Sequence, residues 1–237
     1  MVGLLVILVV SWVFLRLIEK KNIEVLGIIP YPKRIAQFFI GMALLMLINL
    51  IGIYIESIVM KVDWELNSSI NYTLIYESII YHLKSAITED LVFRGAILYI
   101  LISRIGAKWA ILVSAILFGM YHVFSYGMTG DRIIPIMYVI LVTGFVGYVW
   151  AYTFHKTKSI FMALGFHLGS NLINTFFFDA QPYGELIFTE ISRANVSEWN
   201  NFLFQIFKGL FPTILTLIFL KLALWSDLKI FQPNGQN

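Results

Sequence analysis

The sequence contains no cysteine and few charged residues. The absence of cysteine excludes disulfide bonds, thiolate zinc sites and cysteine nucleophiles, so any catalysis must use other side chains. Only 13% of the 237 residues are charged, whereas soluble domains carry about a quarter. Hydrophobic residues make up 59% of the chain, which leaves too little polar surface for contact with water. The composition therefore predicts an integral membrane protein.

Apolar runs occupy most of the chain and predict about seven transmembrane helices. A helix needs about 20 apolar residues to cross a hydrocarbon core of about 30 Å. The runs cover residues 2–18, 35–55, 74–103, 109–124, 133–154, 160–178 and 202–224. The longest connection, 179–201, is either a lid or a connector, and we expect a connector. The pattern predicts an all-α polytopic membrane helix bundle, with residues 1–237 forming a single membrane domain.

Basic residues flank the apolar runs instead of forming a patch, so the net charge of +3 does not indicate nucleic-acid binding. They are unevenly divided between alternate connections. One set contains Arg16, Lys20, Lys21, Lys33, Arg34, Arg104, Lys108, Lys156, Lys158 and Lys229, and the other contains Lys61, Arg132 and Arg193. The positive-inside rule predicts an outside N-terminus and a cytoplasmic C-terminus. We expect the protein to reside in the cell membrane.

Charged residues inside the third apolar run are the first sign of a functional site. Ionisable side chains at bilayer depth cost several kcal/mol by some estimates, so they usually pair and serve a function. Asp90 and Arg94 are four residues apart with the acid first, which favours an ion pair within one helix. Glu89 points about 100° away from Asp90. It is therefore free to act as a general base.

Two further runs carry polar residues that complete this set. His122 ends the fourth run, and His167 and Asn171 lie in the sixth run at positions i and i+4, on one helix face. His82 and His155 are interpreted as ordinary interfacial residues. Together with Glu89, the residues His122, His167 and Asn171 supply a base, donors and an acceptor. The set predicts a catalytic site within the bundle.

At these residues the chain resembles the CPBP family of intramembrane proteases. This group includes CAAX proteases, bacteriocin-processing proteins and the Ras-converting prenyl endopeptidases. The family pattern is Glu-Glu-x-x-x-Arg, then Phe-x-x-x-His, then His-x-x-x-Asn or Asp. It is met here by Glu89-Asp90-x-x-x-Arg94, Phe118-x-x-x-His122 and His167-x-x-x-Asn171. The resemblance places the catalytic core at about residues 74–178.

The resemblance implies an endopeptidase that cleaves a membrane-associated substrate, such as a prenylated or leader-type peptide. It implies that Glu89 activates a water molecule with help from His122, while His167 and Asn171 stabilise the oxyanion. Arg94 would hold Asp90 and the helix in register. Asp90 departs from the pattern, because the family usually has a second glutamate there, one methylene longer.

A zinc protease is the alternative mechanism, since Glu89, His122 and His167 are acceptable zinc ligands. The sequence has no His-Glu-x-x-His helix, and no second carboxylate would remain as the base if Glu89 bound the metal. We therefore expect no cofactor.

Two other classes of protein use buried ionisable residues. One is a transporter or proton relay, although the chain shows no inverted repeat. The other is a non-catalytic member of the same family with an immunity or scaffold role. The lipid bilayer is an expected partner in every case.

Overall fold

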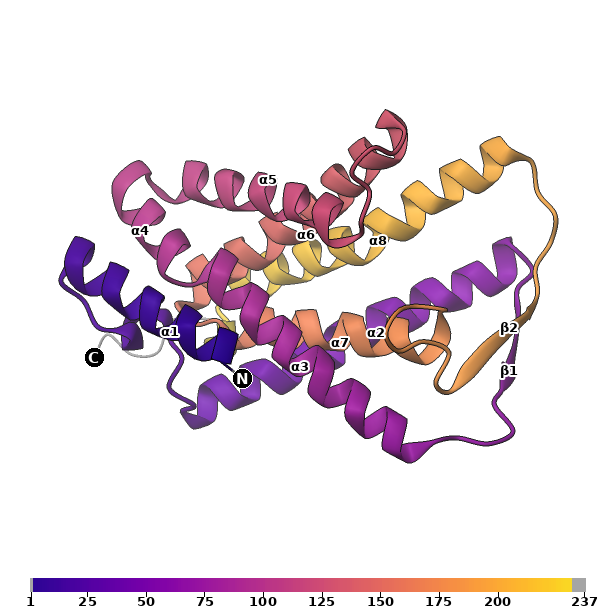
Figure 1. The fold of residues 1–237 in the computed structure, drawn as a ribbon, viewed down its shortest axis with the longest axis horizontal. Coiled ribbons are helices and arrows are strands. Elements are labelled where there is room, and N and C mark those ends of the chain that lie inside the picture. Colours follow the sequence, from indigo (N-terminus) through magenta and orange to yellow (C-terminus); the bar gives the residue numbers. More distant parts are fainter. Residues whose placement is uncertain (1, 232–237) are drawn as a thin grey trace.

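The computed structural model describes residues 2–231, which form eight α-helices and two short strands (Figure 1). The helices are α1 (Val2–Phe14), α2 (Pro32–Val59), α3 (Tyr72–Arg94), α4 (Ala96–Ile105), α5 (Ala107–Ser125), α6 (Ile133–Thr157), α7 (Phe161–Phe177) and α8 (Glu198–Trp225). A π-helical turn, Leu15–Glu19, extends α1. The strands are β1 (Asp63–Leu66) and β2 (Phe188–Ser192). This architecture confirms the predicted all-α membrane bundle.

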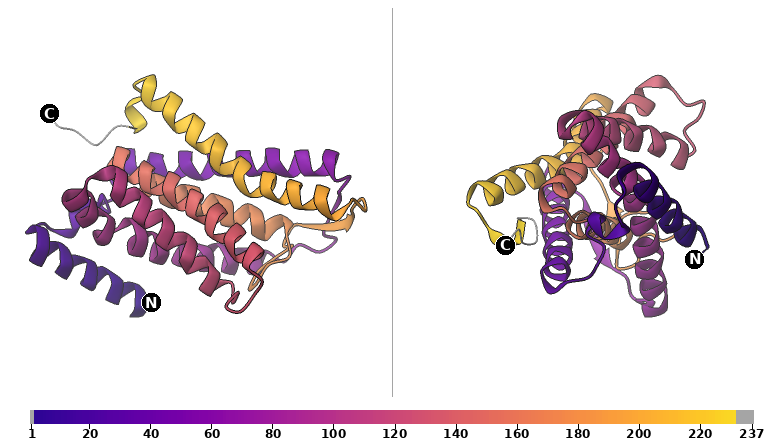
Figure 2. Two further views of the ribbon diagram at one scale, coloured as in Figure 1. Left: turned by 90° about the horizontal axis from the view of Figure 1, so that it is seen from above. Right: turned by 90° about the vertical axis from the view of Figure 1, so that its left-hand side faces the viewer.

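Five of the described helices are long and apolar enough to cross a membrane, namely extended α1, α2, α5, α6 and α8. The view along the bundle in Figure 2 shows α1 and the C-terminal part of α8 at the periphery. By contrast, α7 runs through the middle of the bundle, and eleven of its seventeen residues are buried (Figure 1). The molecule is an integral, multi-pass membrane protein with a helix enclosed by protein at its centre.

The third predicted run is divided, contrary to the single helix expected over 74–103. It forms α3 and α4, which meet at Gly95. A Cβ atom on Gly95 would lie 2.1 Å from the carbonyl oxygen of Leu91, so a larger residue would clash. The hydroxyl of Ser114 on α5 donates to the Phe93 carbonyl oxygen at 2.8 Å. The break ends α3 at Arg94 and turns α4 away from the axis of α3.

Glycines bring α2 and α7 into close contact. A Cβ on Gly165 would lie 2.1 Å from the Phe38 carbonyl oxygen, and one on Gly169 would lie 2.5 Å from that of Met42. Lipid tails are as apolar as leucine, so helices in a membrane associate through close packing, which small residues permit. This contact fixes the central helix against α2.

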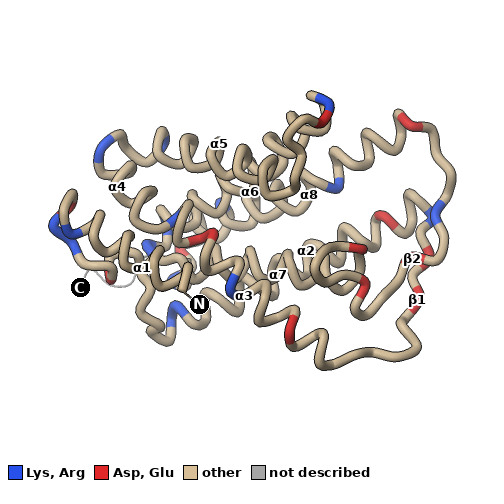
Figure 3. Tube along the Cα trace, viewed as in Figure 1, with Lys and Arg blue, Asp and Glu red and all other residues tan. Residues whose placement is uncertain are grey.

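Charges divide the molecule into two ends (Figure 3). Helices α2, α5 and α7 begin at one end, which we call the basic end. It carries Lys20, Lys21, Lys33, Arg34, Arg104, Lys108, Lys156, Lys158 and Lys229. The opposite end holds β1 and β2 and most of the loop acids, and we call it the strand end (Figures 1 and 3). The connections that carry most of the basic residues therefore lie at the basic end. The alternate connections lie at the strand end.

The connection 179–201 contains a strand that the sequence did not predict. β2 pairs with β1 in antiparallel fashion. Beyond β2, Arg193 donates to Glu56 at 2.8 Å and to Glu190 at 2.6 Å. The hydrogen bond from Arg193 lowers the pKa of Glu190. The connection is therefore anchored to α2 and is more than a simple connector.

Candidate active site

Glu89 on α3 and two histidines from other helices meet inside the bundle. The Glu89 Oε2 atom lies 4.0 Å from Nε2 of His122 on α5 and 3.8 Å from Nε2 of His167 on α7. These distances exceed a direct hydrogen bond of about 2.7–3.2 Å. Each separation is short enough for one water molecule, about 2.8 Å from either atom, to bridge it. The Ser85 hydroxyl donates to the other carboxylate oxygen, Oε1, at 3.0 Å.

A backbone contact identifies which ring nitrogen of His122 carries the proton. Its Nδ1 lies 2.8 Å from the Phe118 carbonyl oxygen. A carbonyl oxygen can only accept, so Nδ1 carries the proton in this hydrogen bond. In neutral His122, the other nitrogen, Nε2, therefore presents a lone pair toward Glu89. The ring also packs edge-on against Phe118, with 4.4 Å between the ring centroids. His122 is thus held with the lone pair of Nε2 toward Glu89, where it can accept a hydrogen bond.

Asp90 and Arg94 form the ion pair predicted from their spacing, and both side chains are fully buried. The Arg94 guanidinium also lies over two rings, 4.2 Å from the Phe118 centroid and 4.8 Å from the Trp150 centroid. A cation over an aromatic face gains electrostatic energy, and more so where water is excluded. The pair joins the end of α3 to α5 and α6 beside the site.

His167 links this ion pair to Glu89. Its Nδ1 lies 3.5 Å from Asp90 Oδ1, while its Nε2 faces Glu89. The ring lies against Trp150, with 4.6 Å between the centroids. Both ring nitrogens thus face carboxylate oxygens, which are acceptors. In neutral His167, either nitrogen can therefore carry the proton and face an acceptor.

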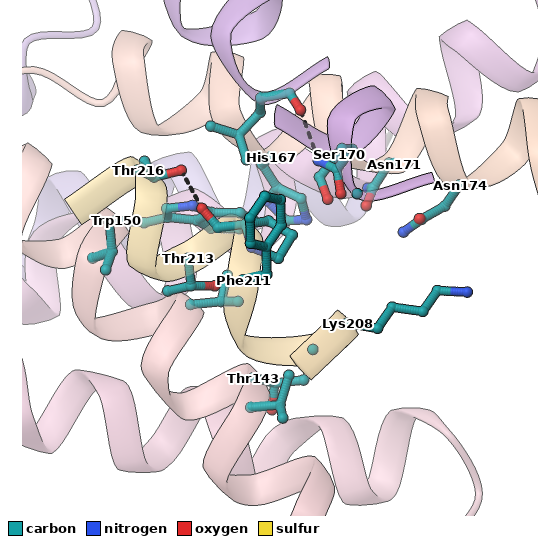
Figure 4. A pocket seen from close by; sticks show the side chains of 18 of the residues that line it. Thr143, Trp150, His167, Ser170, Asn171, Asn174, Lys208, Phe211, Thr213 and Thr216 are labelled. Atoms are coloured by element: carbon teal, nitrogen blue, oxygen red, sulfur yellow. Dashed lines mark hydrogen bonds between the residues drawn. The ribbon is translucent and has the colours of Figure 1, made fainter. Parts of the chain in front are cut away.

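A cavity of about 250 Å³ adjoins the two histidines. Asn171 lines it, one turn beyond His167 on α7. Figure 4 shows Ser170, Asn171 and Asn174 beside His167, with side chains from α8 across the cavity. Contacts of 4.0 Å or less link Glu89, Asp90, Arg94, His122 and His167 into one cluster. Asn171 shares the cavity with the histidines.

Several polar and aromatic residues beside the site were not predicted from the sequence. Trp150 underlies His167 and Arg94, although nothing local distinguishes it from other core aromatics. Glu56 lines the cavity, is buried, and pairs with Lys208 of α8 at 2.8 Å. The sequence feature that could have identified Glu56 is its place, as an acid, directly after the apolar run 35–55. His82 is one of the two histidines interpreted as interfacial, and its Nε2 lies 2.9 Å from the Thr175 hydroxyl.

The residues at this site do not fit a zinc ion as they are placed. Two donors about 2.0 Å from a tetrahedral zinc lie about 3.3 Å apart, whereas Glu89 is 3.8 and 4.0 Å from the two histidines. Across residues 2–231, no group of three or more His, Asp or Glu side chains is arranged to hold a metal. The spacing suits a bridging water molecule better.

In this membrane bundle a buried carboxylate meets two histidines that line an internal cavity. Residues 71–173 match the family model described as type II CAAX prenyl endopeptidase Rce1-like, a family of proteases. Over these residues the chain is similar to this family, which the three motifs also indicated. No curated protein and no solved structure matches the chain.

Proposed function

We propose that this protein is an intramembrane endopeptidase in which Glu89 activates water. The observation that carries the proposal is the position of Glu89 Oε2, 3.8–4.0 Å from Nε2 of both His122 and His167. Oε2 is buried and makes no hydrogen bond to any described residue. A carboxylate in a site with little water is a strong enough base to polarise a water molecule held between these groups.

The reaction is a hydrolysis in which water adds across the peptide bond. Glu89 accepts one proton of the water, and the lone pair of His122 Nε2 orients the other. The water oxygen then attacks the carbonyl carbon, and Glu89 passes its proton to the leaving amide nitrogen. The C–N bond breaks, which produces a carboxylic acid and an amine, and the acid then gives its proton to the amine to form a carboxylate and an ammonium group. Positioned acid–base groups of this kind contribute about 10²–10⁴-fold to rates.

His167 and Asn171 are proposed to stabilise the oxyanion. The Nε2–H of His167 and the side-chain amide of Asn171 are donors that line the same cavity. Donors fixed in advance at developing charge commonly supply the largest catalytic contribution. Asp90 and Arg94 act indirectly, because Asp90 faces His167 Nδ1 and Arg94 neutralises Asp90. The substrate is proposed to be a membrane-associated peptide or protein.

Membranes from cells that make the active protein are expected to contain new peptide termini that are absent from cells making Glu89→Ala. The comparison is made by mass spectrometry of protein N- and C-termini. His122→Ala serves as a second inactive variant and should remove the same termini. Identical termini in all three samples would favour a non-catalytic role.

Activity is expected to survive exhaustive chelation, because the proposed mechanism uses no metal. Purified protein in detergent should contain less than one zinc per chain by elemental analysis. Cleavage of the substrate identified above is measured before and after chelation. The alternative zinc mechanism would be supported by one zinc per chain, if removing the zinc abolished cleavage and restoring it recovered cleavage.

A further inference from the structure

Trp150 on α6 lies against two residues of the candidate site, although α6 supplies none of the residues predicted to form it. The Trp150 ring centroid is 4.6 Å from the centroid of the His167 ring and 4.8 Å from the guanidinium carbon of Arg94. The Trp150 side chain is buried and also lines the cavity. These contacts allow three roles, namely filling the core, contacting the substrate, or orienting the two site residues.

The two histidines that face Glu89 are held in different ways. The His122 ring is fixed by its hydrogen bond of 2.8 Å with the Phe118 carbonyl oxygen. By contrast, Nδ1 of His167 is buried 3.5 Å from Asp90 Oδ1 and forms no hydrogen bond within the described part of the chain. An imidazole ring turns over a broad range of angles about its last side-chain bond unless a contact restricts it. The orientation of His167 therefore depends on the rings packed against it.

Trp150 makes the closer of the two ring contacts with His167. The planes of these two rings are inclined by 37°, whereas Phe118 meets His167 edge-on with 6.5 Å between the centroids. Tilted and offset ring pairs are favourable beyond the area that they bury. The Trp150 contact thus limits how far the His167 ring can turn. In the orientation that it allows, Nδ1 of His167 faces Asp90 and Nε2 faces Glu89.

Arg94 also depends on ring contacts for its position. Its one hydrogen bond within residues 2–231 goes to Asp90, and its buried Nε and Nη2 atoms have no partner there. A planar guanidinium packs favourably on aromatic rings, and that of Arg94 lies over Phe118 and Trp150. Glu89 directly precedes Asp90, so it would compete for an Arg94 side chain that was free to turn. Such a pair would make Glu89 a weaker base.

We propose that Trp150 is a positioning residue of the candidate site. Its indole ring holds the His167 ring with Nε2 toward Glu89. It also keeps the Arg94 guanidinium on Asp90, which leaves Glu89 without a competing cation. The effect on catalysis rests on the proposed protease function, in which Glu89 and His167 act on one substrate carbonyl. The orientation of His167 is a property of the protein without substrate and is tested separately.

Two substitutions separate the aromatic face of Trp150 from its bulk. Trp150→Phe keeps a flat ring, whereas Trp150→Leu keeps an apolar side chain without one. Phe154→Leu is the matched control, because Phe154 lies one turn farther along α6 and is 2% exposed. It belongs to a buried cluster that does not include Trp150. Thermal unfolding in detergent measures how far each variant remains folded.

NMR of protein labelled with 15N in its four histidine rings measures the orientation of His167 without turnover. The 15N shifts of an imidazole ring report which nitrogen carries the proton and whether the ring has one environment. His167→Gln assigns the His167 signals by removing them. These signals are expected to keep their positions in Trp150→Phe and in Phe154→Leu. In Trp150→Leu they should shift or broaden, because the ring becomes free to turn.

The His122 signals provide an internal reference for this measurement. They should stay unchanged in all three variants, because the hydrogen bond between His122 and the Phe118 carbonyl does not involve Trp150. His167 signals that are unaltered in Trp150→Leu would overturn the proposal. Equal changes at His122 and His167 would show a general loss of packing and would overturn it too. So would equal changes in Trp150→Phe and Trp150→Leu, because the aromatic face would then not be what holds His167.

In a cleavage assay, Trp150→Leu is expected to lower kcat by about 10²-fold, a loss typical of a misplaced group in an active site. Trp150→Phe and Phe154→Leu should keep most of the wild-type rate. KM should change little in Trp150→Leu, whereas loss of a substrate contact would chiefly raise KM. Combined with His167→Gln, Trp150→Leu should cause a much smaller further loss, because residues that act together are not additive.

A wild-type kcat in Trp150→Leu would overturn the positioning role. So would a full 10²-fold further loss in the double variant, since Trp150 would then act independently of His167. Wild-type protein that cleaves no substrate would contradict the proposed function. The NMR result would still decide whether Trp150 orients His167.

Discussion

Replacing Glu89 with glutamine is expected to lower the rate of peptide cleavage by about 10²–10⁴-fold, the range typical of a lost general base. Glutamine has nearly the same size and can still accept a hydrogen bond from Ser85 through its amide oxygen. It cannot accept a proton from water at neutral pH. The rate is measured in proteoliposomes with a substrate peptide, at saturating and at low concentration, so that kcat and KM are separated.

The same measurement on Glu24→Gln provides the control, because Glu24 is an exposed acid in the short helix between α1 and α2, at the basic end. It should cleave at the wild-type rate. Thermal unfolding in detergent should show that Glu89→Gln remains folded. A Glu89→Gln variant that cleaves at a rate near wild type would disprove the general-base role.

The local parts of the site were predictable from sequence spacing. Asp90 and Arg94 pair as their i, i+4 spacing predicted, because this interaction needs only the geometry of one helix. The order of the motifs also predicted which three helices would meet, since ionisable groups in a membrane are driven to face the bundle interior. The distances joining Glu89, His122 and His167 depend on helix packing, which spacing does not specify.

The features that were missed depend on contacts distant in sequence. Glu56 pairs with Arg193, 137 residues later, and with Lys208, 152 residues later. Nothing near Glu56 in the sequence identifies these partners. The break at Gly95 was missed for a different reason, because apolar composition continues across it and a single glycine within a helix is common. Only the clash with Leu91 in the folded structure identifies that glycine as a break.

Removing the positive charge of Arg94 is expected to produce the largest loss of stability among single substitutions at the site. Arg94→Met would leave the Asp90 carboxyl group fully buried without its partner, a change that typically costs about 3–5 kcal/mol in the free energy of unfolding. It would also remove the cation from the rings of Phe118 and Trp150. Stability is measured by unfolding in mixed detergent micelles.

Two variants separate the charge effect from a general effect of substitution. Arg104→Met removes an exposed arginine that pairs with Glu19, and such pairs contribute at most about 1 kcal/mol. The double variant Asp90→Asn/Arg94→Met removes both buried charges, so it should recover much of the stability lost in Arg94→Met. Because Asp90 faces His167, the double variant should nevertheless cleave slowly while folding well. If Arg94→Met is as stable as Arg104→Met, then the buried ion pair does not hold the site together.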